Sequence, residues 1–458
     1  MNVCKFGGSS LADAAQVQKV CRIVAADAQR RLVVVSAPGK RSDDDIKVTD
    51  RLIACGEMVL RGENASDAMA VVVERFASIH RELSLPQSVM DEIRADLVGR
   101  LDADATHDLR FMDLMKAAGE DNAARLVAAA LTESGVPAMY VNPRDAGMVV
   151  TSEYGEARLL DSAYTKLASL KDLDCVGVFP GFFGYDVDGH VATFSRGGSD
   201  ITGSILAAAV GADMYENFTD VDSVKVADPR IVDNPVAITE LTPREMRELS
   251  YAGFSVLHDE AIAPAVKAGV PICVKNTNRP ERPGTRIVSS HEKTSARVVG
   301  IASAGGFCSI YVRKYLMNRE VGFGRRLLQI LEDEGLSYEH TPSGIDDMSV
   351  VLAEAQLDST RESRVIKRIM DELGADDVGV EHDLALIMVV GEGMRFGVGL
   401  AATATAALSE AGVNIEMMNQ GSSEISMMFG VKGADRAKAV QSIYSAYYEN
   451  GTASTATP

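Results

Sequence analysis

The chain has 458 residues, too many for one hydrophobic core, so we expect two or three domains. Hydrophobic residues make up 46% and charged residues 24%, which is typical of soluble globular proteins, and no apolar run is long enough to cross a bilayer. The formal net charge of −19 argues against binding to nucleic acid or to anionic membranes, because either partner requires a basic surface.

The six cysteines include no CxxC pair, and none lies near a histidine at ligand spacing, so we expect no metal site formed by the protein itself. Three of them, Cys4, Cys175 and Cys273, lie in apolar runs typical of small core residues. The N-terminus lacks a signal-peptide pattern, since Lys5 and two glycines stand where an apolar segment is needed. These features predict a reduced, cytoplasmic protein.

Residues 1–290 alternate short apolar runs with stretches of helical spacing. This rhythm predicts a domain whose largely parallel sheet is covered by helices on both faces. The expected strands are 33–35, 138–141, 175–179 and 270–274, and the expected helices are 122–134, 201–210 and 261–267.

Two glycine-serine turns lie in this part, at residues 5–10 (Lys-Phe-Gly-Gly-Ser-Ser) and 195–200 (Ser-Arg-Gly-Gly-Ser-Asp). Each follows a predicted strand and precedes a predicted helix, so both are expected at the carboxyl edge of the sheet, where ligands bind. There they can direct backbone N–H groups at one anion. This predicts phosphoryl chemistry. The chain has no GxxxxGK[ST] motif and no HRD or DFG set, so it is neither a P-loop NTPase nor a typical protein kinase.

After a polar linker at 289–296, the chain is expected to form two small α/β units. The first, residues 304–382, has the order βαββαβ, and the second, residues 383–450, lacks its sixth element. We infer that a spare strand at 297–303 completes the second sheet, so that the first unit is inserted within the second. Residues 451–458 are polar and are expected to fray. The expected strands are 307–313, 336–341, 348–352, 378–381, 384–390, 413–419 and 424–431, and the expected helices are 322–334, 359–373, 398–410 and 434–448.

With these segments in view, the chain resembles the aspartate kinases. Besides the two turns, the matching segments in order are 218–222 (Phe-Thr-Asp-Val-Asp), 228–230 (Asp-Pro-Arg) and 246–258 (Met-Arg-Glu-Leu-Ser-Tyr-Ala-Gly-Phe-Ser-Val-Leu-His). The two βαββαβ units resemble the paired ACT domains that close these enzymes. The resemblance covers essentially the whole chain, and it implies an α/β amino-acid-kinase fold followed by two ferredoxin-like ACT domains.

The resemblance also implies a reaction. MgATP would phosphorylate the side-chain carboxylate of L-aspartate, giving 4-phospho-L-aspartate. This is the first step towards the aspartate-family amino acids lysine, threonine and methionine. The long segment 40–48 and the variant at 340–346 resemble a subgroup with members that serve ectoine synthesis, which is the alternative branch. We expect a monofunctional enzyme, since no room remains for a dehydrogenase domain after residue 450.

Two residues are implied as catalytic. Lys5 is suited to bridge the transferring phosphate, because phosphoryl transfer depends mostly on positioning and positive charge; the alternative is a surface lysine beside a strand. Asp200 is expected to organise the site through Lys5, a water or a metal ion; the alternative is a simple helix N-cap, and both could hold at the same time. The nucleophile is a carboxylate that is already ionised, so no general base is required.

Substrate contacts are implied for Thr49, Glu120, Arg196, Gly197 and Ser199. Arg196 can grip the α-carboxylate with two hydrogen bonds. Glu120 aligns with a family glutamate that contacts the amino group, and we expect Gly119-Glu120 to open a helix. The alternative is a first-turn glutamate favoured by the helix dipole. Thr49 follows the segment 40–48, which is longer and more charged than in many relatives.

The resemblance implies ATP as cofactor, with Mg²⁺ carried by the nucleotide. Lys225 stands where many relatives have tyrosine, and Lys275 is expected to replace a phosphate-contacting lysine that is absent at Asn278. The implied ATP contacts are Lys5, Gly7, Gly8, Ser9, Thr219, Asp220, Lys225, Asp228, Arg230 and Lys275.

An amino-acid effector, lysine or threonine, is expected at the ACT domains. The alternative is that these segments are only dimerisation surfaces. ACT domains commonly pair sheets between chains, so we expect a homodimer, with a tetramer as the alternative. The implied effector residues are Met317, Gly322, Phe323, Gly324, Glu339, Asn414 and Ile415.

Two other functions compete with this interpretation. The first is a kinase of the same fold that acts on glutamate or UMP, and the combination of Arg196, Glu120 and an ACT pair argues against it. The second is an amino-acid sensor with an inactive kinase domain, and the intact Lys5, Arg196 and Asp200 argue against that.

Overall fold

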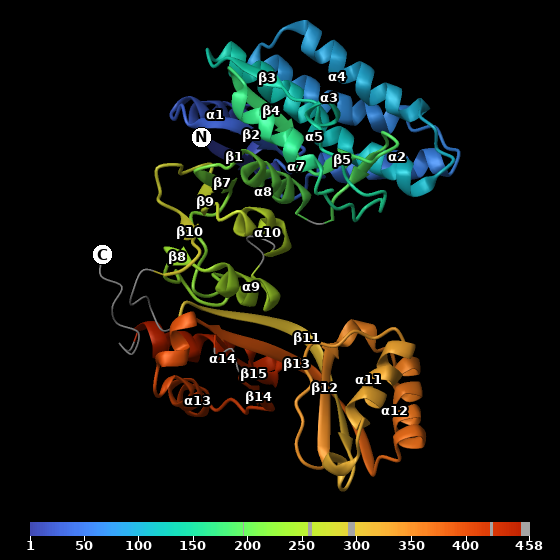
Figure 1. Cartoon of the computed structure of the whole chain (residues 1–458), viewed down its shortest axis with the longest axis vertical. Coiled ribbons are helices and arrows are strands. Elements are labelled where there is room, and N and C mark those ends of the chain that lie inside the picture. Colours follow the sequence, from blue (N-terminus) through green and yellow to red (C-terminus); the bar gives the residue numbers. More distant parts are fainter. Residues whose placement is uncertain (196, 255–258, 292–297, 422–424, 450–458) are drawn as a thin grey trace. The chain divides into compact units, whose positions relative to one another are not determined.

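The structure, a computed structural model, describes residues 1–195, 197–254, 259–291, 298–421 and 425–449 (Figure 1). Among these residues, no helix is long and apolar enough to cross a membrane. The chain divides into two compact units. The first comprises Met1–Val224, Thr239–Pro243 and Ser255–His291, and the second comprises Lys225–Ile238, Arg244–Phe254 and Glu292–Pro458.

An eight-stranded sheet forms the centre of the first unit, in the order β3-β4-β2-β1-β7-β9-β10-β8. Every neighbouring pair is parallel except β9 and β10. The central strands are apolar almost throughout because both of their faces are covered, and Val33, Val34 and Val35 expose no surface. The strands are β1 (Asn2–Phe6), β2 (Arg30–Val35), β3 (Ala138–Tyr140), β4 (Val176–Pro180), β7 (Met214–Thr219), β8 (Glu240–Leu241), β9 (Ile272–Asn276) and β10 (Thr285–Ile287).

Helices cover both faces of this sheet, as the sequence predicts. Helices α1–α5 share a hydrophobic core with Cys4 and Phe6 of β1, while α8 packs against β1, β2 and β7 and is itself covered by α10. The helices are α1 (Ala14–Ala25), α2 (Val48–Leu60), α3 (Ser66–Leu83), α4 (Gln87–Gly99), α5 (Asp108–Glu133), α6 (Pro143–Ala146), α7 (Ala163–Leu167), α8 (Gly198–Val210) and α10 (Asp259–Lys267); β5 (Phe183–Tyr185) and β6 (Val191–Thr193) form a hairpin.

Helix α5 corrects one sequence prediction. The expected helix at 122–134 begins at Asp108 instead, so Gly119 and Glu120 lie in its middle and do not open it. Glycine often marks a helix boundary, but here it serves close packing, because a Cβ at Gly119 would lie 2.6 Å from the Cβ of Ala37. The alternative interpretation of Glu120 as a first-turn glutamate is therefore wrong.

A five-stranded antiparallel sheet forms the centre of the second unit, in the order β12-β11-β13-β15-β14. Strands β11 and β13 have 14 residues each and run through both halves of this sheet. Residues 300–305 pair with 385–390, and 307–313 pair with 377–384. The elements are β11 (Gly300–Arg313), β12 (Asp347–Ala353), β13 (Asp377–Val390), β14 (Met417–Asn419), β15 (Ser426–Lys432), α9 (Pro243–Tyr251), α11 (Phe323–Asp333), α12 (Ser359–Leu373), α13 (Leu400–Glu410) and α14 (Arg436–Tyr444), which continues as a π-helical turn at Ser445–Glu449.

Helices α11 and α12 pack on one half of this sheet around Ile310, Leu327 and Ile369, all fully buried or nearly so. The predicted strand at 336–341 is wrong. The backbones of Glu339 and His340 bond only to Val351, and Pro342 has no N–H with which to extend the ladder. Of the predicted strand at 413–419, only the last three residues form a strand, β14. Most of the expected linker and the tail at 451–458 lie outside the described residues.

The contact between α8 and β7 generates a stability prediction. Gly203 of α8 faces the buried ring of Tyr215, and an added Cβ would lie 2.6 Å from its Oη. Tyr215 Oη donates to the carbonyl oxygen of Asp200 at 3.1 Å, so the ring is not free to move aside. We expect Gly203→Ala to lower the free energy of unfolding by about 1–3 kcal/mol, although alanine is the better helix former.

Urea unfolding followed by circular dichroism measures this change. Gly99→Ala is the matched control, because Gly99 ends α4 with a φ of −61° and a Cβ added there would meet no atom within 4 Å. The control should be unchanged or slightly more stable. Equal stability of the two variants would contradict the close packing of α8 on β7.

Candidate active site

The carboxyl ends of β1 and β7 and the first turn of α8 meet at one ion pair. Lys5 Nζ lies 2.6 Å from Asp200 Oδ1, and the two side chains are only 9% and 16% exposed. Asn217 Nδ2 donates to the same oxygen at 2.7 Å. Because the pair is largely shielded from water, each charge needs the other to compensate for its lost hydration.

Sequence reasoning missed Asn217. The strand register aligns Asn217 of β7 with Lys5 of β1, and aligned residues of neighbouring strands lie on the same face of a sheet. The available signal was an asparagine inside the apolar run of β7. The register that links it to Lys5 joins segments more than 200 residues apart, so the sequence alone does not reveal it.

The second glycine turn is held by very close packing. Gly197 is the N-cap of α8, with a φ of 77°, and Asp200 lies in the first turn. The alternative interpretation of Asp200 as the N-cap is therefore wrong. A Cβ at Gly198 would lie 2.4 Å from the ring of Phe182, and a Cβ at Gly181 would lie 2.6 Å from Ser199. Glycine is thus required for the approach of these loops. Arg196 lies outside the described residues.

The first glycine turn packs against the loop that follows β2. Gly7 N–H donates to the carbonyl oxygen of Phe218 at 3.1 Å, and Gly39 N–H donates to that of Gly8 at 2.8 Å. A Cβ at Gly8 would lie 2.9 Å from the carbonyl oxygen of Ala37. Ser9 lies in the short 3₁₀ helix Gly8–Leu11 that follows. The turn is a cradle that a side chain would fill, as expected of a phosphate site.

Glu120 projects from the middle of α5 and is 5% exposed. Burial raises the pKa of this carboxyl group to about 8, although the backbone N–H of Ala37 opposes the shift by hydrogen bonding to it. Its Oε2 atom has no hydrogen-bond partner among the described residues. A buried, unsatisfied carboxylate oxygen suits a ligand with N–H donors. Thr49 lies in the first turn of α2 and is half-buried.

The predicted nucleotide residues are divided between the two units. Thr219 is the last residue of β7 and Asp220 follows it, and Thr219 Oγ1 donates to Asp220 Oδ1 at 3.2 Å. Lys275 aligns with Phe218, one residue from Asn217, and so projects to the face opposite Lys5; its Nζ lies 3.9 Å from Glu216. The other three residues, Lys225, Asp228 and Arg230, lie in the second unit. Lys225 forms an isolated β-bridge with Ala237, and Arg230 forms an ion pair with Asp228 at 2.7 Å.

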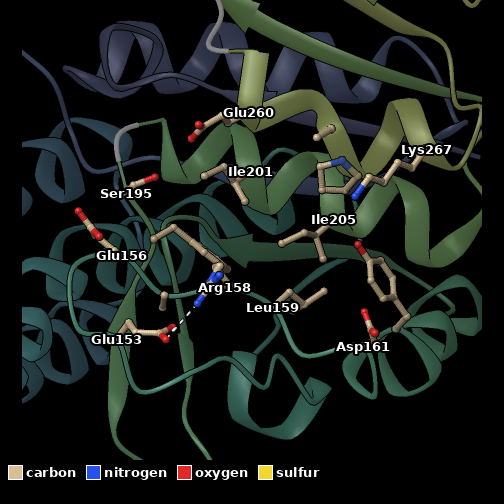
Figure 2. Close-up of a pocket in the computed structure, with 15 residues that line it drawn as sticks. Glu153, Glu156, Arg158, Leu159, Asp161, Ser195, Ile201, Ile205, Glu260 and Lys267 are labelled. Carbon is tan, nitrogen blue, oxygen red and sulfur yellow. Dashed lines mark hydrogen bonds and ion pairs between the residues drawn. The ribbon is translucent and has the colours of Figure 1, made fainter. Parts of the chain in front are cut away.

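A cavity of about 800 Å³ lies beside the second glycine turn (Figure 2). Ile201 and Ile205 of α8 form part of its wall, and Glu260 and Lys267 project from α10. Its other wall is the loop 153–161, in which Arg158 pairs with Glu153 at 3.0 Å. Apart from Ser195, which belongs to the turn, none of these residues is a predicted site residue.

The predicted effector residues lie in the second unit. Gly322 caps α11 with a φ of 80°, and Phe323 is buried in its first turn; Gly324 follows, and Met317 lies in the preceding 3₁₀ turn. A second group is more scattered: Tyr251 donates to Glu339, Asn414 donates to Glu416 at 2.9 Å, and Ile415 precedes β14. A cavity of about 470 Å³ on this unit is lined by other residues, among them Tyr311, Ser343 and Met417.

Known proteins match this architecture over its whole length. A sequence model of the amino acid kinase family matches residues 1–276, and a model of the ACT domain matches residues 387–447. Aspartokinase 3 of Bacillus subtilis (strain 168) is 58% identical over 448 residues, which are 98% of this chain and 99% of that protein.

Solved structures agree. The structure of Clostridium acetobutylicum aspartate kinase has a TM-score of 0.86 and 40% identity, covering 97% of this chain and 100% of that one. Escherichia coli aspartokinase III in complex with aspartate and ADP has a TM-score of 0.78 and 26% identity, covering 98% and 100%. The same enzyme in complex with lysine and aspartate has a TM-score of 0.78 and 25% identity, covering 98% and 99%.

The raised pKa of Glu120 predicts how stability depends on pH. Its carboxyl group stays protonated up to about pH 8 in the folded chain but only to about pH 4.5 in the unfolded chain. Its favourable contribution to the free energy of unfolding is therefore present below about pH 4.5 and is lost as the pH rises to 8. In Glu120→Gln, this pH-dependent fall in the free energy of unfolding should be smaller by roughly 2–4 kcal/mol.

Thermal unfolding between pH 5 and pH 9 tests the expectation. The native chain should lose stability relative to Glu120→Gln as the pH rises. Glu133→Gln, at the exposed C-terminal end of the same helix, should follow the native chain. Parallel curves for all three proteins would show that Glu120 is ionised in the folded chain at neutral pH.

Proposed function

Since this chain belongs to the amino acid kinase family and, within it, to the aspartokinases, we propose that Lys5 and the two glycine turns form the site at which it transfers a phosphoryl group from ATP to L-aspartate. The product is 4-phospho-L-aspartate, formed at the side-chain carboxylate. The observation that supports this site best is the shielded pair of Lys5 and Asp200 at the start of α8.

The chemistry requires positive charge more than it requires a base. Aspartate's side chain, with an ordinary pKa near 3.9, is ionised at neutral pH and attacks without losing a proton. The transferring phosphoryl group carries negative charge on its oxygens, and Lys5 with the N-terminal N–H groups of α8 offsets that charge. Asp200 and Asn217 keep the Lys5 ammonium at the strand end, so it is positioned before substrates bind.

The acceptor amino acid would lie between α5 and the second glycine turn. The unsatisfied carboxylate of Glu120 is suited to its ammonium group, and binding that cation would return Glu120 to its charged form. The α-carboxylate is assigned to Arg196, with Gly197, Ser199 and Thr49 as neighbouring contacts. These assignments rest on the resemblance and on the positions of Gly197, Ser199 and Thr49 at helix starts.

ATP is the phosphoryl donor, and the cradle formed by Gly7, Gly8 and Ser9 fits a phosphate group, since only glycine leaves room between Gly8 and Gly39. The bound Mg²⁺ would be held chiefly by the nucleotide and would neutralise phosphate charge. The base and ribose are assigned to Thr219, Asp220, Asp228 and Arg230. Lys225 and Lys275 complete the proposed contacts, with Lys275 the weakest because it faces Glu216.

Regulation through the ACT region follows from the family. The E. coli relative has been solved with lysine and aspartate and with aspartate and ADP. We assign an amino-acid effector, lysine in the first place and threonine as the alternative, to the segments that contain Met317, Gly322 and Glu339. We place the enzyme at the head of lysine, threonine and methionine synthesis, with ectoine synthesis as the alternative branch.

The proposed assembly is a homodimer, with a tetramer as the alternative. The proposed location is the cytoplasm, which supplies ATP and keeps thiols reduced, as suits six cysteines of which none forms a disulfide.

An acyl-phosphate trap tests the function directly. The purified chain, MgATP, hydroxylamine and a panel of carboxylic acids should give a hydroxamate with L-aspartate. Lys5→Ala should lower kcat by about 100-fold or more, because it removes the main cation of the site. Lys171→Ala, at an exposed position, is the matched control and should remain active. Product with glutamate alone would indicate a sister kinase, and no product with any acid would favour the sensor.

Effector titration tests the regulation. L-lysine at millimolar concentration should inhibit hydroxamate formation, with L-threonine as the second arm. Glu339→Gln should weaken inhibition while leaving uninhibited kcat within about twofold, since Glu339 belongs to the second unit. Full activity with both amino acids together would overturn the effector assignment and favour the ectoine branch.

A further inference from the structure

The segment 39–47 is a closed loop whose two ends are joined. Gly39 follows the turn after β2, and Val48 begins α2. Val48 N–H donates to the carbonyl oxygen of Pro38 at 3.2 Å, which closes the loop at its base. The loop therefore connects two parts of the proposed site: the backbone that contacts Gly8, and the helix start that contains Thr49.

Asp45 is the centre of this loop. Most residues around it are exposed, yet its side chain is only 7% exposed. It accepts hydrogen bonds from Arg41 Nε at 2.8 Å and from Arg75 Nη1 at 2.9 Å, and Arg51 lies 3.9 Å away. Hydrogen bonds from Arg41, followed by those from Arg75, hold the pKa of Asp45 well below its usual range. Asp45 is therefore ionised at neutral pH.

Arg75 links the loop to helix α3, on which it is buried with a side chain 6% exposed. Besides the bond to Asp45, its Nη2 donates to the carbonyl oxygen of Gly39 at 2.6 Å. One guanidinium group thus binds both the side chain at the centre of the loop and the backbone at its start. Lysine has a single nitrogen and does not present this planar fork.

The backbone that Arg75 binds is the one that packs on the phosphate turn. Gly39 N–H donates to Gly8 at 2.8 Å, and a Cβ at Gly39 would lie 2.6 Å from the carbonyl carbon of Gly8. Two residues earlier, Ala37 contacts Gly119 and offers its N–H to Glu120. A shift of this segment would consequently displace both the turn assigned to ATP and the carboxylate assigned to the substrate ammonium.

Apolar packing does not hold the loop against α3 on its outer side. A cavity of about 440 Å³ lies there, and Ile46 of the loop and Val71 of α3 both line it. Each of these side chains is nearly half exposed, at 48% and 47%. The charged contacts of Asp45 and Arg75 are thus the main restraint on this side of the loop.

We propose that Arg75 and Asp45 are positioning residues for phosphoryl transfer, which fix Gly39 and through it the phosphate turn at Gly8. Neither is assigned a contact with a substrate: Asp45 holds the Arg75 guanidinium, and Arg75 acts through the backbone of Gly39. The inference rests on the proposed function. It gives a role to the charged segment 40–48, which is longer than in many relatives. Displacement of reacting groups by about an ångström is enough to slow a reaction by up to about 100-fold.

Arg75→Met tests the proposal, because methionine retains much of the apolar stem and loses both bonds. We expect kcat in the hydroxamate assay to fall by about 10- to 100-fold, with the KM for ATP and for aspartate changing by less than about threefold. Arg75→Lys should recover only part of this loss. Arg81→Met is the control on the same helix, where an exposed arginine pairs with Glu74, and it should leave kcat unchanged.

Asp45→Asn provides a second test that does not disturb the core of α3. It should lower kcat by about 3- to 10-fold, while Asp43→Asn in the same loop, which is exposed, should have no effect. Because both residues act through one contact, the loss in the double variant Asp45→Asn/Arg75→Met should be smaller than the product of the separate losses. Independent, multiplicative losses would overturn the shared mechanism.

Amide hydrogen exchange provides a readout that a general loss of stability would not reproduce. In Arg75→Met, peptides covering residues 6–12 and 36–50 should exchange faster, while those of α4 and α10 should not. Unchanged kcat in a folded Arg75→Met would overturn the proposal, as would faster exchange spread over the whole unit. If the native chain formed no hydroxamate, the proposed function would fail first, so the two failures are distinguishable.

Discussion

A largely buried ion pair sets the geometry of the kinase unit. Asp200 lies in the first turn of α8, where the partial positive charge of the helix start favours a carboxylate. It binds Lys5 at the end of β1, and Asn217 donates to the same oxygen from β7. Neither charge is well hydrated, so separating them would cost far more than separating a surface pair. Two strand ends and one helix start are consequently held at fixed distances before any substrate arrives.

Around this pair, the loops approach one another more closely than side chains permit. Gly39 lies against Gly8, Gly181 against Ser199, and Gly198 against Phe182, and in each case a Cβ added to the first residue would fall within 3 Å of the second. Such contacts leave little room for adjustment. Glycine is conformationally permissive, but these close contacts restrict it, so the turns form a rigid cradle. The role proposed for Arg75 follows the same logic, since it binds a carbonyl group in one of these contacts.

Local patterns in the sequence are enough to predict the α/β class, both glycine turns and their place at the carboxyl edge of the sheet. Contacts set by register or by distance are not predictable. Asn217 is distinguished only by its alignment with Lys5, and Arg75 is an ordinary helical arginine until the loop that it binds is seen. The sequence pattern puts Glu120 at a helix start because Gly119 resembles a boundary, whereas that glycine makes room for Ala37. The strand expected at 336–341 is reduced to one isolated bridge between His340 and Val351, because residue types alone do not reveal whether a partner strand is in reach.

The two long strands of the second unit have a mechanical consequence. Strands β11 and β13 pass without a break from one half of the sheet to the other, and each contributes hydrogen bonds to both halves. The halves are therefore joined by paired strands and not by a linker. A twist imposed on one half acts on the same two strands from which the other half is built.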